Sequence, residues 1–218
     1  MLTGEIRPAK KLYGGLMQPV IEVEVGDSRM HGSCSLQLST EEQPTVLRQT
    51  QGITFDGTKY IDLGYRAGNT TKIEIIFRQT EYGKFLFGAR AGANSDDAFA
   101  FCSYQTSMYT QFGSFQAVVN AAITLNDTHT LVLSQGGAVI DGVTVKTFDT
   151  MSFSSEVDLY LGTRNQSGVV DTRIFKGTVY SVKLFENNIL TAWLVPHASG
   201  IEGETGLFDV INRVFYRI

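Results

Sequence analysis

Hydrophobic and polar residues alternate along the last forty residues of the chain in a way that is typical of β-strands. Apolar residues occupy every second position over Tyr180–Leu184, which is the period of a strand with one face on a core and the other in solvent. Glu186-Asn187-Asn188 supplies turn-forming residues, and the apolar run Ile189–Val195, closed by Pro196, predicts the next strand. The last two strands are expected within residues 206–209 and 210–216.

The same alternation begins shortly after residue 50. Ile53 and Phe55 can point inward, and Asp56-Gly57 is a tight-turn dipeptide that favours positive φ. Ile73, Ile75 and Phe77 share one face, with Lys72 and Glu74 on the other. Residues 139–145 form the clearest hairpin pattern. Further strands are expected at residues 85–87, 98–104, 108–112, 117–119, 130–134 and 157–162.

The first fifty residues have their own pattern of predicted strands and connecting residues. Val20–Val25 and Cys34–Leu38 predict two strands of a hairpin or small sheet, and the polar residues 39–44 form a connector. We therefore expect residues 1–50 to be an N-terminal attachment arm or short β extension, and residues 51–218 to be one β-sandwich domain.

Two segments of the chain resemble a known family. Phe55-Asp56-Gly57, followed by Ile61-Asp62-Leu63-Gly64, resembles the opening of laminin-G-like modules of the concanavalin-A-like class, and residues 177–218 resemble their closing segment. The kind of laminin-G-like module that these segments resemble is common in bacteriophage structural proteins and bacterial surface proteins. The resemblance implies an all-β fold, an antiparallel β-sandwich jelly roll, over residues 51–218, with a short N-terminal β extension. Such modules usually bind ligands and do not catalyse reactions.

Composition and charge limit the classes of function that the chain can have. At 43% hydrophobic and 18% charged residues the chain can bury a sizeable core. Its net charge of −4 argues against a general nucleic-acid binder, since phosphate binding needs clustered Lys and Arg. No apolar run approaches the roughly 20 residues that a membrane helix needs, so no membrane insertion is expected. The start, Met1–Pro8, lacks a hydrophobic signal region, which predicts synthesis and assembly in a host cytoplasm.

Three residues are expected to be buried. The two cysteines, Cys34 and Cys102, are too few for a disulfide scaffold and each shares a strand face with apolar residues, so both are expected to be free thiols. Trp193 lies in an apolar strand and is expected in the core.

Two acidic pairs invite comparison with glycosidases. Retaining glucanases place two carboxylates on one side of a sugar, and Glu22/Glu24 and Glu156/Asp158 have the required spacing of two residues on a strand. Neither pair continues into a longer acidic signature, and a solvated strand face explains both. We therefore expect no catalytic residues and no enzyme.

One loop could bind a metal ion. Asn94, Asp96 and Asp97 could offer oxygen ligands to calcium, which takes six to eight of them. An ordinary hairpin loop of this composition is the alternative. No other cofactor is expected.

The most suggestive surface lies between Ser103 and Phe112. Strand alternation would place hydroxyl, amide and aromatic side chains together on one face: Ser103, Gln105, Ser107, Tyr109 and Gln111. It would place the core residues on the other: Cys102, Tyr104, Met108 and Phe112.

A polar face of this kind suits a neutral sugar. Hydroxyls and amides can bond its rim, and an exposed Tyr109 can stack on its apolar face. Arg90 and Arg164 lie in loops that could line the same end. The alternative is an ordinary solvated sheet face.

The resemblance, taken with these patterns, implies a non-catalytic virion surface protein of bacteriophage type, with a lectin-like jelly roll for adhesion to host-surface glycans. Residues 1–50 would contact other virion proteins, and the protein would be a homo-oligomer or part of a large assembly. The alternatives are a purely structural capsid or tail decoration (cement) protein without ligand, and a glucanase-like, glycan-cleaving enzyme.

Overall fold

The structure is a computed structural model that describes residues 47–92, 96–120, 123–199 and 204–218. Within these residues the chain forms two β-sheets, one of ten strands and one of eight. The ten-stranded sheet contains β1 (Leu47–Gln49), β2 (Ile53–Asp56), β4 (Thr71–Gln79), β9 (His129–Ser134), β10 (Gly137–Ile140), β11 (Val143–Lys146), β15 (Lys176–Glu186), β16 (Ile189–Ser199), β17 (Thr205–Asp209) and β18 (Val214–Arg217). The eight-stranded sheet contains β3 (Ile61–Asp62), β5 (Lys84–Arg90), β6 (Ala98–Ser103), β7 (Met108–Gly113), β8 (Phe115–Val119), β12 (Tyr160–Leu161), β13 (Asn165–Gln166) and β14 (Val169–Val170).

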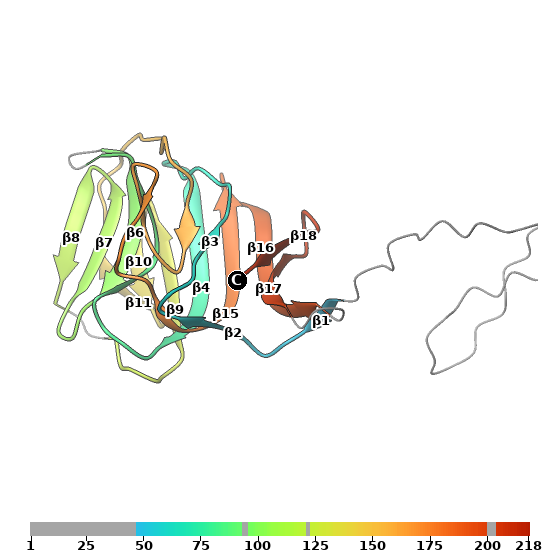
Figure 1. The fold of residues 1–218 in the computed structure, drawn as a ribbon. Coiled ribbons are helices and arrows are strands. Elements are labelled where there is room, and N and C mark those ends of the chain that lie inside the picture. The colour runs from blue at the N-terminus through green and yellow to red at the C-terminus, as the bar shows by residue number, and fades with distance from the viewer. Residues whose placement is uncertain (1–46, 93–95, 121–122, 200–203) are drawn as a thin grey trace, which may run out of the picture. The chain divides into compact units, whose positions relative to one another are not determined.

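The order of the strands confirms the expected all-β sandwich. The main path of the first sheet is β11-β10-β9-β4-β15-β16-β17-β18, and that of the second is β14-β13-β5-β6-β7-β8, with β6, β7 and β8 side by side (Figure 1). The strands pair antiparallel except β13, which runs parallel to β5. None of the described elements is a helix long and apolar enough to cross a membrane.

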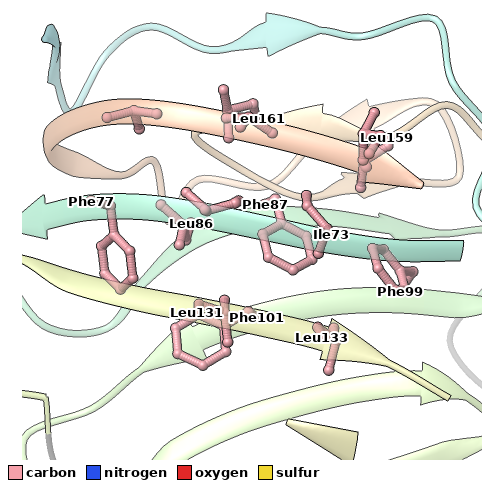
Figure 2. Packing of buried hydrophobic residues seen from close by; sticks show 14 of the residues in the cluster. Ile73, Phe77, Leu86, Phe87, Phe99, Phe101, Leu131, Leu133, Leu159 and Leu161 are labelled. Carbon is pink, nitrogen blue, oxygen red and sulfur yellow. The ribbon is translucent and has the colours of Figure 1, made fainter. Parts of the chain in front are cut away.

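The core lies between the two sheets. On β4, Ile73, Ile75 and Phe77 have no exposed surface, as the alternation predicts, while Lys72 and Glu74 form an ion pair of 2.9 Å on the opposite face. Figure 2 shows side chains of β4 and β9 gathered with those of β5 and β6 in one core. Each large apolar side chain buried in this way stabilises the fold by about 1.5–3 kcal/mol.

Turn residues fix the hairpins where the sequence predicts them. Asp141 and Gly142, between β10 and β11, have φ of 50° and 79°. Asn187 and Asn188, between β15 and β16, have φ of 50° and 63°. Two successive positive φ values match the right-handed twist of the flanking strands, and Asn, Asp and Gly adopt them at the least cost.

Three expectations about strands are wrong. The strand expected at residues 157–162 is reduced to the two residues of β12. β16 runs through Pro196 to Ser199, and β1 pairs with it from His197 onward. Trp193 is 38% exposed because it alternates with Leu194, which faces the core, and the indole lies on the outer face of the ten-stranded sheet.

The N-terminal strands pair along β15 and β16. β15 pairs with β16 over Val182–Glu186 and with β2 over Lys176–Val179, while β1 takes the edge of β16 at residues 197–199. The sheet therefore begins at Leu47, slightly before the expected boundary at residue 51. The strands expected at Val20–Val25 and Cys34–Leu38 lie outside the described residues, and the division into 1–50 and 51–218 stays a prediction.

A pair of fragments tests this division. We expect fragment 51–218 to unfold cooperatively, but with a free energy of unfolding about 1–3 kcal/mol lower than that of fragment 47–218, because it lacks the short β1 ladder and the 2.9 Å bond from Thr50 N to Pro196 O. Urea denaturation followed by circular dichroism measures the difference. A molten or insoluble 51–218 fragment would place the boundary elsewhere, and equal stabilities would show that β1 contributes nothing.

Candidate functional site

A second, smaller apolar cluster lies on the outer face of the eight-stranded sheet, the face that points away from the core. Its members are Phe85, Ala100, Cys102 and Tyr109, and they are separate from the main core cluster. Cys102 on β6 lies directly opposite Tyr109 on β7, which brings these buried side chains to the same face. The outer face of β6 and β7 is thus covered and not simply solvated.

Arg164 crosses this face. It follows β12, and its aliphatic stem passes over β5 at Gly88, where an added Cβ would lie only 2.7 Å from the Arg164 Cγ. Its guanidinium carbon stands 4.4 Å from the centre of the Phe85 ring, within range of a cation–π contact. Because Gly88 has no side chain, the buried Arg164 can reach the cluster.

Asp171 joins two arginines. Arg173 donates from Nε to Asp171 Oδ1 at 3.1 Å and from Nη2 to Oδ2 at 3.0 Å, a bidentate geometry. Arg164 donates from Nη2 to the same Oδ2 at 2.8 Å. Arg173 also lies 4.3 Å from the Phe85 ring centre and donates from Nη1 to the Tyr104 hydroxyl at 3.2 Å.

A third arginine, Arg90, ends β5 on the same outer face. Its backbone lies opposite Gln166 of β13, whose side-chain oxygen accepts a 2.6 Å hydrogen bond from Arg164. Among the described residues, no ion pair or hydrogen bond reaches the Arg90 guanidinium, and its Nε is buried. We call Arg90, Arg164 and Arg173 the arginine cluster.

The titration of these groups follows from burial and charge. Burial raises the pKa of Tyr109, against the opposing influence of the three arginine charges. Burial also lowers the pKa of Arg164, against the opposing charge of Asp171. For Asp171 burial alone would raise the pKa, but hydrogen bonds from Arg173 and the charges of both arginines hold it below its usual value. The hydrogen bond to Asp171 raises the pKa of Arg173.

Two of the residues expected to bind sugar lie on this face, but they are not exposed. Tyr109 and Gln111 share the outer face of β7, as alternation predicts, yet they are only 8% and 3% exposed. The Tyr109 hydroxyl donates to Gln111 Oε1 at 2.7 Å. The expectation of an exposed Tyr109 is therefore wrong, because the arginine cluster, from segments distant in sequence, lies around it.

The turn between β6 and β7 changes the expected facing of its neighbours. Gln105 is exposed in this turn, and Ser107 is half-buried, with its carbonyl accepting the Tyr104 N–H at 2.7 Å. Ser103 points to the core, where its hydroxyl donates to Gln79 Oε1 at 2.5 Å. The register that predicted Ser103 beside Tyr109 is wrong because these turn residues lie outside the strand ladder.

Cys102 lies on the outer face and not, as expected, on the core face with Met108 and Phe112, which are in the core. Its thiol is free and buried, and burial raises the pKa to about 11. The free-thiol expectation is confirmed for Cys102, whereas Cys34 lies outside the described residues.

The structure describes two of the three proposed calcium ligands. Asn94 lies outside the described residues, and Asp96 is exposed. Asp97 accepts hydrogen bonds from the backbone N–H groups of Ala91 at 3.4 Å and Glu156 at 3.2 Å. In the part of the chain that the structure describes, no group of three His, Cys, Asp or Glu side chains could hold a metal ion. Calcium binding stays a prediction.

The acidic pairs do not form a glycosidase site in the described residues. Glu156 lies in a bend before β12, so Glu156 and Asp158 are not alternate positions of a strand, as was expected. Asp158 accepts a hydrogen bond from Arg66 Nε at 3.2 Å. Glu22 and Glu24 lie outside the described residues.

The sequence reasoning missed Asp171 and Arg173. The alternation of Asp171, Thr172 and Arg173 is a weak signal for a charge pair. Nothing in the sequence pattern connects that pair to Phe85 or Arg164, because the contacts depend on backbone hydrogen bonds of the tertiary structure. Phe85 N donates to Arg173 O at 2.9 Å, and Asp171 N donates to Arg164 O at 2.9 Å.

Comparisons with known proteins identify the fold. No protein-family model and no curated protein matches this chain. A solved structure, a putative carbohydrate binding protein from Bacteroides ovatus, shares 13% identity with a TM-score of 0.51, covering 76% of this chain and 56% of that one. The CBM40 of the Ruminococcus gnavus IT-sialidase, bound to α2,3 sialyllactose, shares 20% identity over 63% of this chain and 90% of that one, with a TM-score of 0.49.

The laminin α1 chain of mouse, domains LG4-5, shares 20% identity over 66% of this chain and 44% of that one, with a TM-score of 0.48. At these identities the likeness concerns the fold alone. The expected antiparallel β-sandwich jelly roll is confirmed as the fold of the described residues by the strand order and by the likeness to the Bacteroides ovatus structure.

Proposed function

We propose that the described β-sandwich is a non-catalytic glycan-binding module, and that glycans bind the outer face of its eight-stranded sheet. The observation that carries this proposal is the gathering of hydrogen-bonding side chains over buried aromatic rings on that one face. Arg173 is 38% exposed there, beside the half-buried hydroxyl of Tyr104. Directed polar groups over an apolar base are what a sugar ring needs.

The neighbouring strand extends this surface. On β8, Gln116 lies opposite Gln111 and Val118 opposite Tyr109, and both β8 side chains are exposed. The Bacteroides ovatus protein of the same fold is described as a putative carbohydrate binding protein, which supports a binding role. Asp158 is bound by Arg66, and Glu156 does not lie in a strand, so the two carboxylates are not arranged as in a glycosidase. This arrangement favours glycan binding without cleavage.

The biological setting rests on the sequence resemblance. We propose that the module is displayed on a bacteriophage virion for adhesion to host-surface glycans, with residues 1–50 contacting other virion proteins and the chain forming part of a homo-oligomer or larger assembly. Cryo-electron microscopy of the parent particle would test this setting. Absence of the chain from purified particles would contradict it.

One observation favours a second candidate, a structural decoration protein. On the outer face of the ten-stranded sheet, Trp193 and Ile76 are 38% and 39% exposed, and the indole donates to Ser181 Oγ at 3.2 Å, next to Ile76 in the ladder. Exposed apolar side chains of this size suit a contact with a neighbouring subunit. Burial of this face at a seam between subunits, with no glycan bound, would favour this candidate.

A steric block tests the proposed binding face. We expect the full chain to bind members of a glycan array, and we expect Gln116→Trp, which puts a bulky ring on the outer face of the eight-stranded sheet, to weaken that binding at least tenfold. The matched control is Thr130→Trp, at an exposed position of β9 in the other sheet. Both variants should melt close to the parent temperature.

The outcomes separate the candidates. Equal loss of binding in both variants, or in neither, would place the glycan elsewhere. Release of reducing ends from a bound polysaccharide would favour the glucanase-like enzyme, and the lack of any bound glycan would favour the decoration protein.

A further inference from the structure

The arginine cluster carries more positive charge than its surroundings neutralise. Asp171 is the one carboxylate among the described residues that pairs with the cluster, and it serves both Arg164 and Arg173. Arg90 has no ion pair among those residues. Three guanidinium groups and one carboxylate therefore lie on one face of one sheet, which is an excess of two positive charges.

The excess positive charge of the arginine cluster is partly buried, and this burial destabilises the fold. Arg164 is 5% exposed and Tyr109, on which all three arginine charges act, is 8% exposed. Like charges that are removed from water repel each other more strongly than they do in solution. An uncompensated cluster of buried charges therefore makes this face a candidate site for a negatively charged group.

Two donors in the cluster also lack acceptors. The Nε atoms of Arg90 and Arg164 are buried and have no hydrogen-bond partner among the described residues. A buried donor without an acceptor destabilises the fold, so such groups call for an explanation. The planar guanidinium offers its donors in a fork that matches the two oxygens of a carboxylate or sulfate.

We propose that the arginine cluster binds the anionic group, a carboxylate or a sulfate, of an acidic glycan. Arg90, which forms no ion pair within the described part of the chain, and Arg173, which is partly exposed, contact that group, and Arg164 lies beneath them and adds its charge. The inference rests on the proposed glycan-binding function and adds the class of glycan. It also replaces the expectation of a neutral sugar.

The surroundings favour a glycan over a nucleic acid as the source of the anion. The positive charge is confined to one small cluster, whereas nucleic-acid binding needs a basic surface that follows many phosphates. The Tyr104 hydroxyl and the Gln166 side chain stand next to the arginines and can bond sugar hydroxyls.

The test uses the full chain and matched pairs of immobilised oligosaccharides. One pair is oligogalacturonides and their methyl esters, which lack only the carboxylate charge, and the other is sulfated galactan and the same galactan after desulfation. Biolayer interferometry measures affinity. We expect at least tenfold tighter binding of the charged member of one pair, and which pair responds distinguishes carboxylate from sulfate.

Two arginine variants test the residues. Arg90→Gln removes an unpaired charge, so we expect an unchanged melting temperature and at least a tenfold loss of affinity for the charged glycan, partly restored in Arg90→Lys. The matched control is Arg66→Gln, which removes an arginine paired with Asp158 on the exposed surface and should leave affinity unchanged. Equal losses in both variants would indicate attraction by net charge and overturn the assignment.

The remaining outcomes distinguish the two proposals. Equal binding of charged and neutral members, or preference for the neutral ones, would overturn the anionic class but leave glycan binding standing. Binding of a single-stranded DNA oligonucleotide in preference to every glycan would overturn the choice of ligand, and failure to bind any glycan would overturn both proposals.

Discussion

Asp171→Asn is expected to lower the free energy of unfolding by about 3–5 kcal/mol, the usual cost of removing one partner of a buried ion pair. The side chains of Asp171 and Arg164 are only 9% and 6% exposed, so the variant leaves a buried guanidinium with no counter-charge. It also releases the bidentate contact of Arg173. Urea denaturation of the full chain measures the change.

Two further variants isolate the electrostatic cause. Asp158→Asn removes an exposed partner of Arg66, and such surface pairs contribute about 0–1 kcal/mol. The double variant Asp171→Asn with Arg164→Met removes the stranded charge, and we expect it to recover at least half of the loss. If the double variant is no more stable than Asp171→Asn alone, Asp171 acts through local backbone contacts and not through Arg164.

The same carboxylate makes stability depend on pH in a defined direction. The folded state lowers the pKa of Asp171, so its contribution is present above the pKa of the unfolded chain, roughly 3.9, and is lost as the pH falls through the lower folded value. We expect the difference in stability between the parent and Asp171→Asn to be constant from pH 7 to about pH 5 and to shrink at more acidic pH.

Gly88→Ala is expected to destabilise the domain by about 1–3 kcal/mol, the usual cost of overpacking. The new Cβ would lie 2.7 Å from Arg164 Cγ, 2.9 Å from Arg164 Cβ and 3.1 Å from Ala100 Cβ. Both neighbours are buried, so neither can simply move into solvent. The arginine must therefore leave its path across β5, and the 2.8 Å bond to Asp171 must lengthen or break.

Gly136→Ala supplies the matched control for this prediction. Its new Cβ would have only the Ser134 hydroxyl oxygen, 3.6 Å away, as a neighbour, which is ordinary van der Waals contact. We expect its melting temperature to stay within about one or two degrees of the parent, since surface changes of this kind stay within about 0.5 kcal/mol. Equal melting temperatures for Gly88→Ala and Gly136→Ala would show that Arg164 does not cross β5 at Gly88.

Alternation along the chain was sufficient to predict most strands of the sandwich. Residues 72–77 and the hairpin turns at Asp141-Gly142 and Asn187-Asn188 behave as the sequence predicts, because side-chain period and positive φ are properties of short segments. The predictions of a buried Trp193 and of a strand over residues 157–162 were wrong because they also relied on short segments alone. Apolar character alone does not say whether a sheet face is covered.

The candidate site was predictable only in part. Alternation correctly placed Tyr109 and Gln111 on one face of β7. Arg90 and Arg164 were expected in loops at the same end of the domain, whereas Arg90 is the last residue of β5. It did not predict that the face is buried, or that Asp171 and Arg173 belong to it. Those facts depend on contacts between segments far apart in the sequence, such as that between Arg173 and Tyr104, which are 69 residues apart.

The sequence by itself determined the all-β class, the positions of the turns and the apolar face of the central strands, since each follows from the chemistry of a few adjacent residues. Only the tertiary structure decided which residues share the outer face of the eight-stranded sheet. The parallel pairing of β13 with β5 sets Gln166 beside Arg90, and the missing side chain at Gly88 lets Arg164 reach Phe85. A charge cluster of this kind forms when strands distant in sequence pair with each other. It therefore cannot be predicted from the order of residues along one strand.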